Sequence, residues 1–184
     1  IKKYKKQTKK QSEEIVKILI EEYKDAKCGL DYTTPFSLVV ALILAAQCTD
    51  KRVNEITPIF FEKYKTIEEV KNASIDEVID IIKPCGFYSN KAKSIIGSAQ
   101  IVCDNFNGIV PNTMKELTTL TGIGRKSANI LLQEWFGTIE GIAVDTHVTR
   151  IVRKIGFSNG KTQFEIESEL LKLFDKKYWV KINH

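Results

Sequence analysis

One lysine of this chain follows a glycine turn closely, where it could act as a nucleophile. Residues 117–129 have the sequence LTTLTGIGRKSAN, with Lys126 shortly after the glycines. Glycine tolerates positive φ, so the pair predicts a tight turn whose backbone can approach another molecule closely. The first N–H groups of the next helix have no acceptor within it and bind a phosphate oxygen well. The stretch therefore predicts a helix, a phosphate-binding hairpin and a second helix.

Lys126 is expected in the first turn of that second helix. The partial positive charge of a helix N-terminus disfavours an ammonium ion, and so do the neighbouring Arg125 and any partial burial. These effects favour the neutral amine, which is the form that Schiff-base chemistry needs. A lysine in this position could also serve only to contact a phosphate. The motif alone leaves both roles open.

A carboxylate lies downstream, in residues 142–147 with the sequence IAVDTH. Asp145 is placed to cap a further helix, a contribution of about 1 kcal/mol. Held in this way, an ionised carboxylate could stabilise a developing positive charge on a sugar, or accept a proton from an attacking amine. His147 has no evident partner in the pattern and is assigned no role. The lysine and the carboxylate together suggest chemistry on nucleic acid.

Composition predicts a globular protein, and its modest positive charge is compatible with an anionic partner without requiring one. The chain has 184 residues, 43% of them hydrophobic, and a formal net charge of +5, so it can bury a core as one domain or two small lobes. It has no apolar run near about 20 residues and no hydrophobic signal region, so we expect an intracellular protein without membrane contact. The first ten residues predict either a solvated tail or one that adds non-specific DNA affinity. They contain Lys2, Lys3, Lys5, Lys6, Lys9 and Lys10.

The four cysteines give no metal-binding pattern. They are widely spaced and form no C-x-x-C motif, so no zinc or iron–sulfur ligands are expected within residues 1–184. In a reducing compartment, free structural thiols are the expected state. The cysteines are Cys28, Cys48, Cys85 and Cys103.

Nearly every periodic segment favours a helix and none favours a strand, so the predicted fold class is all-α. Pro35 should begin an apolar helix that ends near Ala46. Asp50 should cap the next helix, which Pro58 should kink or split. Ser89 should cap a long helix up to about residue 107. Further helices are expected over residues 12–23, 113–120 and 125–136, after the caps Thr66, Ser74 and Thr162, and from Asp145 to residue 155.

Several motifs together make the sequence resemble the helix–hairpin–helix DNA glycosylases, and within them the endonuclease III family. LTGIGRKSANILL followed by IAVDTH is similar to the family's central motif. Residues 34–50, with TPF and AQCTD, resemble the family's SPF…SAQATD stretch. Residues 85–92, CGFYSNKA, resemble its IGLYNSKA stretch. The resemblance extends in order over most of the chain.

The resemblance implies a two-lobed, all-helical fold. Residues 28–136 would form a six-helix barrel that includes the helix–hairpin–helix at 115–136. Residues 12–27 and 137–184 would form the second lobe, after a basic tail at 1–11. Lys126 and Asp145 would face a cleft from opposite lobes.

The resemblance also implies base-excision repair of double-stranded DNA with a damaged base or an abasic site, by a monomer. The damaged pyrimidine would be flipped into the cleft. Lys126 would attack the sugar C1′ and release the base, and the Schiff base would allow β-elimination, which nicks the strand. Asp145 would assist the attack. Phosphate contacts would come from Gly122, Ile123, Gly124 and Arg125.

Three more residues obtain roles from the resemblance. Gln47 matches the glutamine that enters the duplex beside the opposite base. Phe87 stands where the family usually has a leucine wedge; an apolar wedge can open a base step, and core packing is the alternative. Asp50 would lie at the edge of the base pocket, although it could also only cap a helix.

The subfamily follows from absences. Residues 40–48 lack the carboxylate of adenine-excising relatives, and mismatch thymine glycosylases typically have tyrosine at position 126, so oxidised pyrimidines such as thymine glycol are the expected substrates. The alternatives are a non-catalytic DNA-binding module that uses Lys126 only for phosphate, and a mismatch or alkylation glycosylase of the same fold. Most of the family continues into four cysteines that hold a [4Fe–4S] cluster. That cluster is expected if the native chain continues past His184. The compartment would be a bacterial or archaeal cytoplasm, or a nucleus or mitochondrion.

Overall fold

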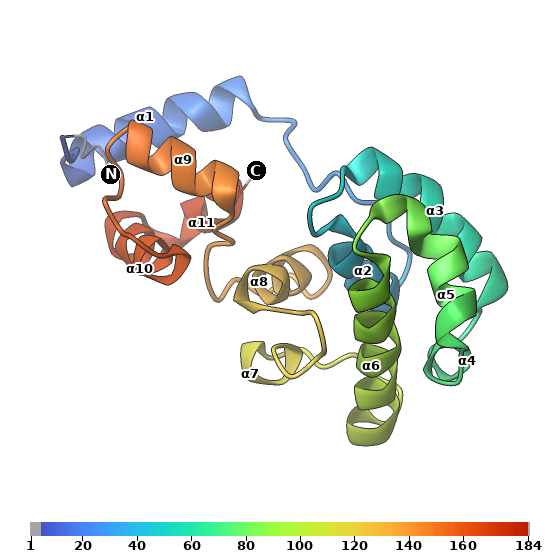
Figure 1. Ribbon diagram of the computed structural model, residues 1–184. Helices are drawn as coiled ribbons and strands as arrows, with labels where there is room; N and C mark the ends of the chain where they lie inside the picture. Colours follow the sequence, from blue (N-terminus) through green and yellow to red (C-terminus); the bar gives the residue numbers. More distant parts are fainter. Residues whose placement is uncertain (1–4, 184) are drawn as a thin grey trace. The chain divides into compact units, whose positions relative to one another are not determined.

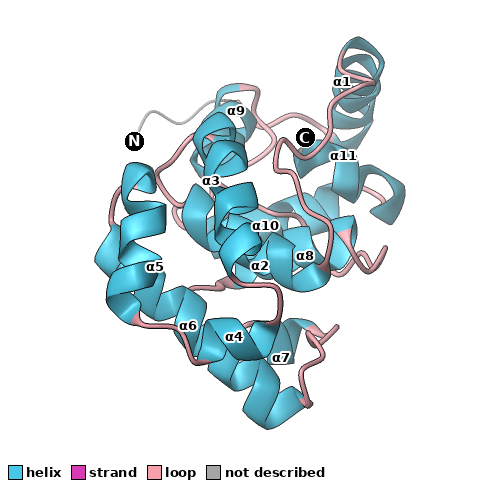
Figure 2. Cartoon of the chain, turned by 90° about the vertical axis from the view of Figure 1, so that its right-hand side faces the viewer, coloured by secondary structure: helices cyan, strands magenta, loops and turns pink. Residues whose placement is uncertain are grey.

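A computed structural model describes residues 5–183, and of Asn183 only the backbone. This part of the chain consists of helices joined by loops and contains no strand (Figure 2), which confirms the all-α prediction. None of its helices is both long and apolar enough to cross a membrane. Lys2 and Lys3 of the basic tail lie outside the described residues. The first helix begins at Lys9, so the end of the expected tail is helical.

The chain divides into two compact units. One unit is the continuous segment Gly29–Phe136, and the other combines Ile1–Cys28 with Gly137–His184. Lys126 belongs to the first unit and Asp145 to the second. Figure 1 labels the helices of both units along the chain.

The continuous unit is built around one apolar helix, α2 (Pro35–Ala45). Residues 36–44 of α2 are buried, and Thr34 caps it with Pro35 in its first turn. α2 packs against α3, α6 and α8, and the long α6 also packs against α4 and α5 (Figure 1). The elements are α2, α3 (Asp50–Lys63), α4 (Ile67–Lys71), α5 (Ile75–Ile82), the 3-10 turn η1 (Lys83–Cys85), α6 (Tyr88–Phe106), α7 (Met114–Leu117) and α8 (Arg125–Glu134).

The predicted helix starts are partly confirmed. Thr66 and Thr162 each form a complete capping box with the glutamate three residues later. The cap predicted for α3 is wrong by one residue: the Thr49 hydroxyl accepts the hydrogen bond, and Asp50 is in the first helical turn. Ser74 is the N-cap of α5, but its side chain makes no capping hydrogen bond.

Two further predictions, one about the start of α6 and one about Pro58 within α3, are wrong in part. α6 begins at Tyr88, so Ser89 is not its cap; the N-cap position is occupied by Phe87 in the left-handed region, with φ 46°. Pro58 does not split its helix, because α3 runs without interruption from Asp50 to Lys63. Tertiary packing of the helix on both sides of a proline can compensate for one lost backbone donor.

The second unit packs around a core of its own. Its helices are α1 (Lys9–Glu22), α9 (Thr146–Lys154), α10 (Gln163–Leu173) and α11 (Trp179–Asn183), with the 3-10 turn η2 (Lys176–Tyr178). The ring of Phe174 lies 4.9 Å from that of Phe157 and 6.4 Å from that of Tyr178. Buried aliphatic and aromatic side chains complete the core: Val16, Ile142, Val144, Val148, Val152, Phe157, Ile166, Leu170, Phe174 and Tyr178.

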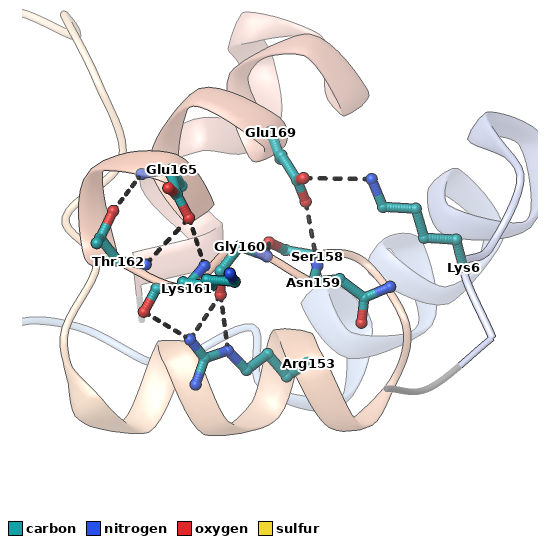
Figure 3. A network of polar contacts seen from close by, with 9 residues as sticks. All are labelled: Lys6, Arg153, Ser158, Asn159, Gly160, Lys161, Thr162, Glu165 and Glu169. Atoms are coloured by element: carbon teal, nitrogen blue, oxygen red, sulfur yellow. Dashed lines mark hydrogen bonds and ion pairs between the residues drawn. The ribbon is translucent and has the colours of Figure 1, made fainter. Parts of the chain in front are cut away.

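Arg153 holds α9 to the loop that precedes α10 (Figure 3). Its Nε and Nη2 donate to the Gly160 carbonyl at 3.0 and 2.6 Å, and Nη2 also donates to the Lys161 carbonyl at 3.0 Å. A planar guanidinium suits two adjacent acceptors, which a single ammonium nitrogen cannot match with the same geometry. Arg153 therefore orients the helix that Asp145 begins.

A second group of contacts in the same loop centres on Glu169 (Figure 3). Its carboxylate accepts from the Asn159 N–H at 3.1 Å and pairs with the Lys6 ammonium at 3.3 Å. Burial opposes ionisation, but hydrogen bonds from Ser158, Asn159 and Lys6 outweigh it and hold the pKa of Glu169 below its usual value. At least one lysine of the basic tail is thus paired within this unit.

Arg153→Lys should lower the free energy of unfolding by about 1–2 kcal/mol, because it removes hydrogen bonds that contribute roughly 1 kcal/mol each. Urea unfolding measures the loss. Arg150→Lys is the matched control, since Arg150 is an exposed residue of the same helix, and it should change stability by less than about 0.5 kcal/mol. Equal stability of the two variants would contradict the role of Arg153.

Candidate nucleic-acid interface and catalytic residues

The turn between α7 and α8 requires a glycine at position 122. Gly122 has φ 82°, and a Cβ there would lie 2.9 Å from the Cβ of Ser94 on α6. The Ser98 hydroxyl of α6 also donates to the Thr121 carbonyl at 2.7 Å. Since both contacts come from α6, this helix fixes the backbone of the hairpin.

The second glycine of the turn, Gly124, lies at the start of α8, and the space that a side chain would occupy there is open. Gly124 is the N-cap, has φ −91° and makes no side-chain cap bond. A Cβ built on Gly124 would meet no atom within 4 Å. Glycine here is therefore not required by packing within the unit. A small residue does leave the first N–H groups of the helix accessible to an oxyanion.

Ile123, one of the residues expected to contact phosphate, has a buried side chain. The side chain is only 4% exposed, and its backbone N–H donates to the Leu120 carbonyl at 3.1 Å. It therefore acts as an apolar anchor that holds the turn against the unit. The accessible groups of the hairpin are those of Gly122, Gly124 and Arg125.

Lys126 is the second residue of α8, as predicted, and is exposed. The opposite face of the helix is buried through Ala128, Leu131 and Leu132. The backbone under the lysine is therefore rigid, while its side chain is accessible to a substrate.

Asp145 is the N-cap of α9, as predicted. Its Oδ1 accepts from the Val148 N–H at 2.8 Å. Ile142, Ala143 and Val144, which precede it, are all buried, so the carboxylate is held from both sides. Asp145 and His147 also line a pocket of about 460 Å³ inside this unit, whose other walls are mostly apolar residues of α1, α9 and α11.

Gln47 and Phe87 share an unusual backbone conformation. Both are exposed, with φ 53° at Gln47 and 46° at Phe87. Left-handed backbone is unfavourable for residues with a Cβ and is frequent at functional sites. The Phe87 residue is 63% exposed, so the alternative that its ring packs in the core is wrong.

Asp50 lies beside Gly29. A Cβ built on Gly29 would be 2.5 Å from Asp50 Oδ2, so the carboxylate occupies the space that a side chain at position 29 would need. The neighbouring Asn54 amide donates to the Gly29 carbonyl at 2.8 Å. The surroundings of Asp50 within this unit are thus the segment before α2.

Sequence reasoning missed Lys91, which is 4% exposed. Its Nζ donates to the carbonyls of Leu44, at 2.8 Å, and Cys85, at 2.9 Å. Lysine is rarely buried, so no pattern pointed to it. Its two acceptors lie in the segments that lead to Gln47 and Phe87.

The described residues do not fit an iron–sulfur cluster. They contain no group of three or more His, Cys, Asp or Glu side chains placed to hold a metal ion. The four cysteines, all within the described part, form no disulfide. Burial and the neighbouring Cys48 raise the pKa of the Cys85 thiol to about 11, which leaves it a poor ligand and a poor nucleophile.

Comparison with known proteins gives consistent matches. The model of the HhH-GPD superfamily of base excision DNA repair proteins matches residues 40–176. Endonuclease III of Synechocystis sp. is 42% identical over 171 residues, which are 93% of this chain and 78% of the relative. Endonuclease III of Bacillus subtilis is 39% identical over 163 residues, 88% of this chain and 74% of the relative.

Solved structures agree. A trapped endonuclease III–DNA covalent intermediate has a TM-score of 0.92 and 37% identity, covering 97% of this chain and 84% of that chain. A thermostable thymine-DNA glycosylase has a TM-score of 0.72 at 20% identity, covering 95% of this chain and 77% of that one, and shares the fold.

The two glycines of the hairpin should respond differently to alanine. Gly122→Ala should lower the free energy of unfolding by about 2 kcal/mol, since it adds left-handed strain and a close contact with Ser94. Gly124→Ala, the matched control, should cost less than about 1 kcal/mol, the difference between the two residues at an N-cap. Urea unfolding of both variants tests this. A Gly124→Ala loss as large as that of Gly122→Ala would contradict it.

Proposed function

Because the chain belongs to the HhH-GPD superfamily of base excision DNA repair proteins, and within it to the endonuclease III family, we propose that it excises oxidised pyrimidines from duplex DNA. The class of activity is that of a DNA glycosylase with AP lyase activity. The observation that carries the finer proposal is Lys126, exposed in the first turn of α8 directly after the glycine hairpin. A relative with the same fold has been trapped as a covalent intermediate with DNA, which supports covalent chemistry here.

The hairpin is proposed to bind the DNA backbone. The open N-terminus of α8 offers N–H groups and a partial positive charge to a phosphate oxygen. Arg125 is exposed beside it and adds a full positive charge. Phosphate contacts fix the position of a protein on DNA without reading its sequence. The hairpin would thereby hold the damaged strand next to Lys126.

Lys126 is the proposed nucleophile. Its neutral amine attacks C1′ of the damaged nucleotide, and the base leaves with the electrons of the glycosidic bond and takes up a proton. The sugar ring then opens, which gives an imine between Nζ and C1′. Loss of a C2′ proton breaks the bond between C3′ and the phosphate oxygen, which cleaves the strand on the 3′ side. Water finally hydrolyses the imine and releases the lysine.

Asp145 is the proposed electrostatic partner of this reaction. Its hydrogen bond to the Val148 N–H fixes the carboxylate on α9, so no reorganisation is needed when charge develops. A carboxylate in this position stabilises positive charge on the sugar or accepts a proton from the attacking amine.

Gln47 and Phe87 are the proposed residues that open the duplex. Phe87 offers an exposed phenyl ring that can enter a base step, and the Gln47 amide can hydrogen-bond with the base left behind. Asp50 is proposed to border the pocket of the flipped base. The partner is thus double-stranded DNA with a damaged base or an abasic site, bound by one copy of the chain inside the cell. No step of this mechanism requires the family's [4Fe–4S] cluster.

The Lys126→Arg variant distinguishes two possible roles of Lys126, as the nucleophile or only as a contact to phosphate. Arginine keeps the positive charge but does not lose its proton, so it cannot form a Schiff base. The variant should bind a duplex with an abasic site within about threefold of the wild-type affinity, yet nick it at least about 100-fold more slowly. Gel-based nicking and fluorescence anisotropy measure the two quantities. Wild-type nicking by Lys126→Arg would show that the lysine only contacts phosphate.

Two substitutions of Asp145 should distinguish its role as a helix cap from its proposed role in catalysis. Asn is as good an N-cap as Asp, so Asp145→Asn should keep stability within about 0.5 kcal/mol, whereas Asp145→Ala should lose about 1 kcal/mol. Both should lower kcat on a thymine glycol duplex by about 100-fold, because both remove the charge. Thermal unfolding and single-turnover kinetics provide the two readouts. Normal turnover by Asp145→Asn would limit the residue to its structural role.

A further inference from the structure

A single buried amine connects two turns that are separate in the sequence. Lys91 lies in α6, and its Nζ is within hydrogen-bonding distance of the carbonyls of Leu44 and Cys85. The three residues belong to the same compact unit, Gly29–Phe136. Among the described residues, Lys91 is the side-chain donor to both carbonyls.

Both carbonyls lie at the ends of helical segments. Leu44 is in the last turn of α2, and Cys85 is the last residue of η1. The final carbonyls of a helix have no N–H donor within it, so they accept hydrogen bonds from elsewhere. A lysine amine at two such ends satisfies both and is attracted by their partial negative charge.

Each carbonyl is followed, within three residues, by a non-glycine residue with left-handed backbone; the third such residue of the described part, Asn107, lies elsewhere. Gln47 comes three residues after Leu44 and has φ 53°, and Phe87 comes two residues after Cys85 and has φ 46°. Such conformations persist only where the surroundings enforce them. The Lys91 hydrogen bonds restrain the chain directly before each of these positions.

The connection does not depend on the charge of Lys91. Burial lowers the pKa of Lys91 below its ordinary value, although the nearby thiols of Cys48 and Cys85 act in the opposite direction. A neutral amine still has two N–H bonds, one for each carbonyl. In either protonation state, the Lys91 amine can therefore donate to both carbonyls, and these two hydrogen bonds compensate for its burial.

We propose that Lys91 is a positioning residue, which holds the turns of Gln47 and Phe87 at a fixed separation for entry into the DNA duplex. The proposal rests on the function proposed above for these two residues. Two groups that must enter the same few base steps have to keep their spacing while the duplex resists. A tie between their backbones supplies that spacing, and a displacement of about 1 Å can cost a factor of about 100 in rate.

The test compares a duplex with a single strand, each carrying one abasic site. A single strand has no opposite base and no paired stack to open, so it needs Lys126 but not the two turns. Lys91→Met, which keeps the length of the side chain and removes its donors, should lower kcat/KM on the duplex by about 10-fold to 100-fold and on the single strand by less than about threefold.

Lys93→Met is the matched control, since Lys93 is exposed on the same helix, and it should leave the ratio of the two activities unchanged. If Lys91→Met does not stay folded in thermal unfolding measurements, Lys91→Gln gives the same comparison with a polar side chain too short for both carbonyls. An equal loss on both substrates would overturn the proposal, because it indicates a purely structural role. Full activity on the duplex would also overturn it.

A double-mutant cycle separates this proposal from the one on which it rests. In a Gln47→Ala, Phe87→Ala background, Lys91→Met should reduce duplex activity by no more than about twofold further, because the residues it positions are gone. If that background alone keeps wild-type duplex activity, the roles proposed for Gln47 and Phe87 are wrong. If it loses activity and Lys91→Met then adds its full effect, only the positioning role of Lys91 is wrong.

Discussion

The proposed interface with DNA depends on how α6 holds three turns. The Ser98 hydroxyl of α6 donates to the Thr121 carbonyl, and Ser94 packs so closely on Gly122 that no Cβ fits there. One helical turn earlier, Lys91 binds the carbonyls before the other two turns. One rigid helix thus sets the backbone of the glycine hairpin and of the two turns that carry Gln47 and Phe87. Sites supported by regular elements keep their geometry better than sites on loops alone.

The second unit follows the same principle with other contacts. Asp145 is fixed by its own helix start, and α9 is fixed by the guanidinium of Arg153 on the loop before α10. The carboxylate is therefore held by its own helix cap and by the buried residues that precede it. The proposed catalytic pair, Lys126 and Asp145, is divided between the two units, so each residue is positioned by local interactions of its own unit.

The sequence predicted those features that depend on local rules. Asp145 as a cap, Thr66 as a capping box and Lys126 in the first turn of α8 all follow from short-range patterns, and the all-α class follows from periodicity. Asp50 and Thr49 are both good caps and adjacent, so the sequence could not distinguish them. The family resemblance, rather than any local rule, pointed to Gln47 and Phe87.

Features that depend on contacts distant in sequence were not predictable. The left-handed conformation of Phe87 contradicts its intrinsic preference, so Ser89, an ordinary capping residue, was expected to begin α6. Lys91 has a side chain that is usually solvated, and only the approach of α2 and η1 shows why it is buried. The side chain of Ile123 is buried and anchors the hairpin. Its expected phosphate contact stays a prediction.

The most direct test of the account is to trap the covalent intermediate and identify the attached residue. Borohydride reduction of the protein with an abasic duplex should give a stable adduct, and digestion followed by mass spectrometry should locate the sugar on the Nζ of Lys126. An adduct on another amine would contradict the assignment of the nucleophile. Tight duplex binding without any adduct or nick would contradict the lyase mechanism itself.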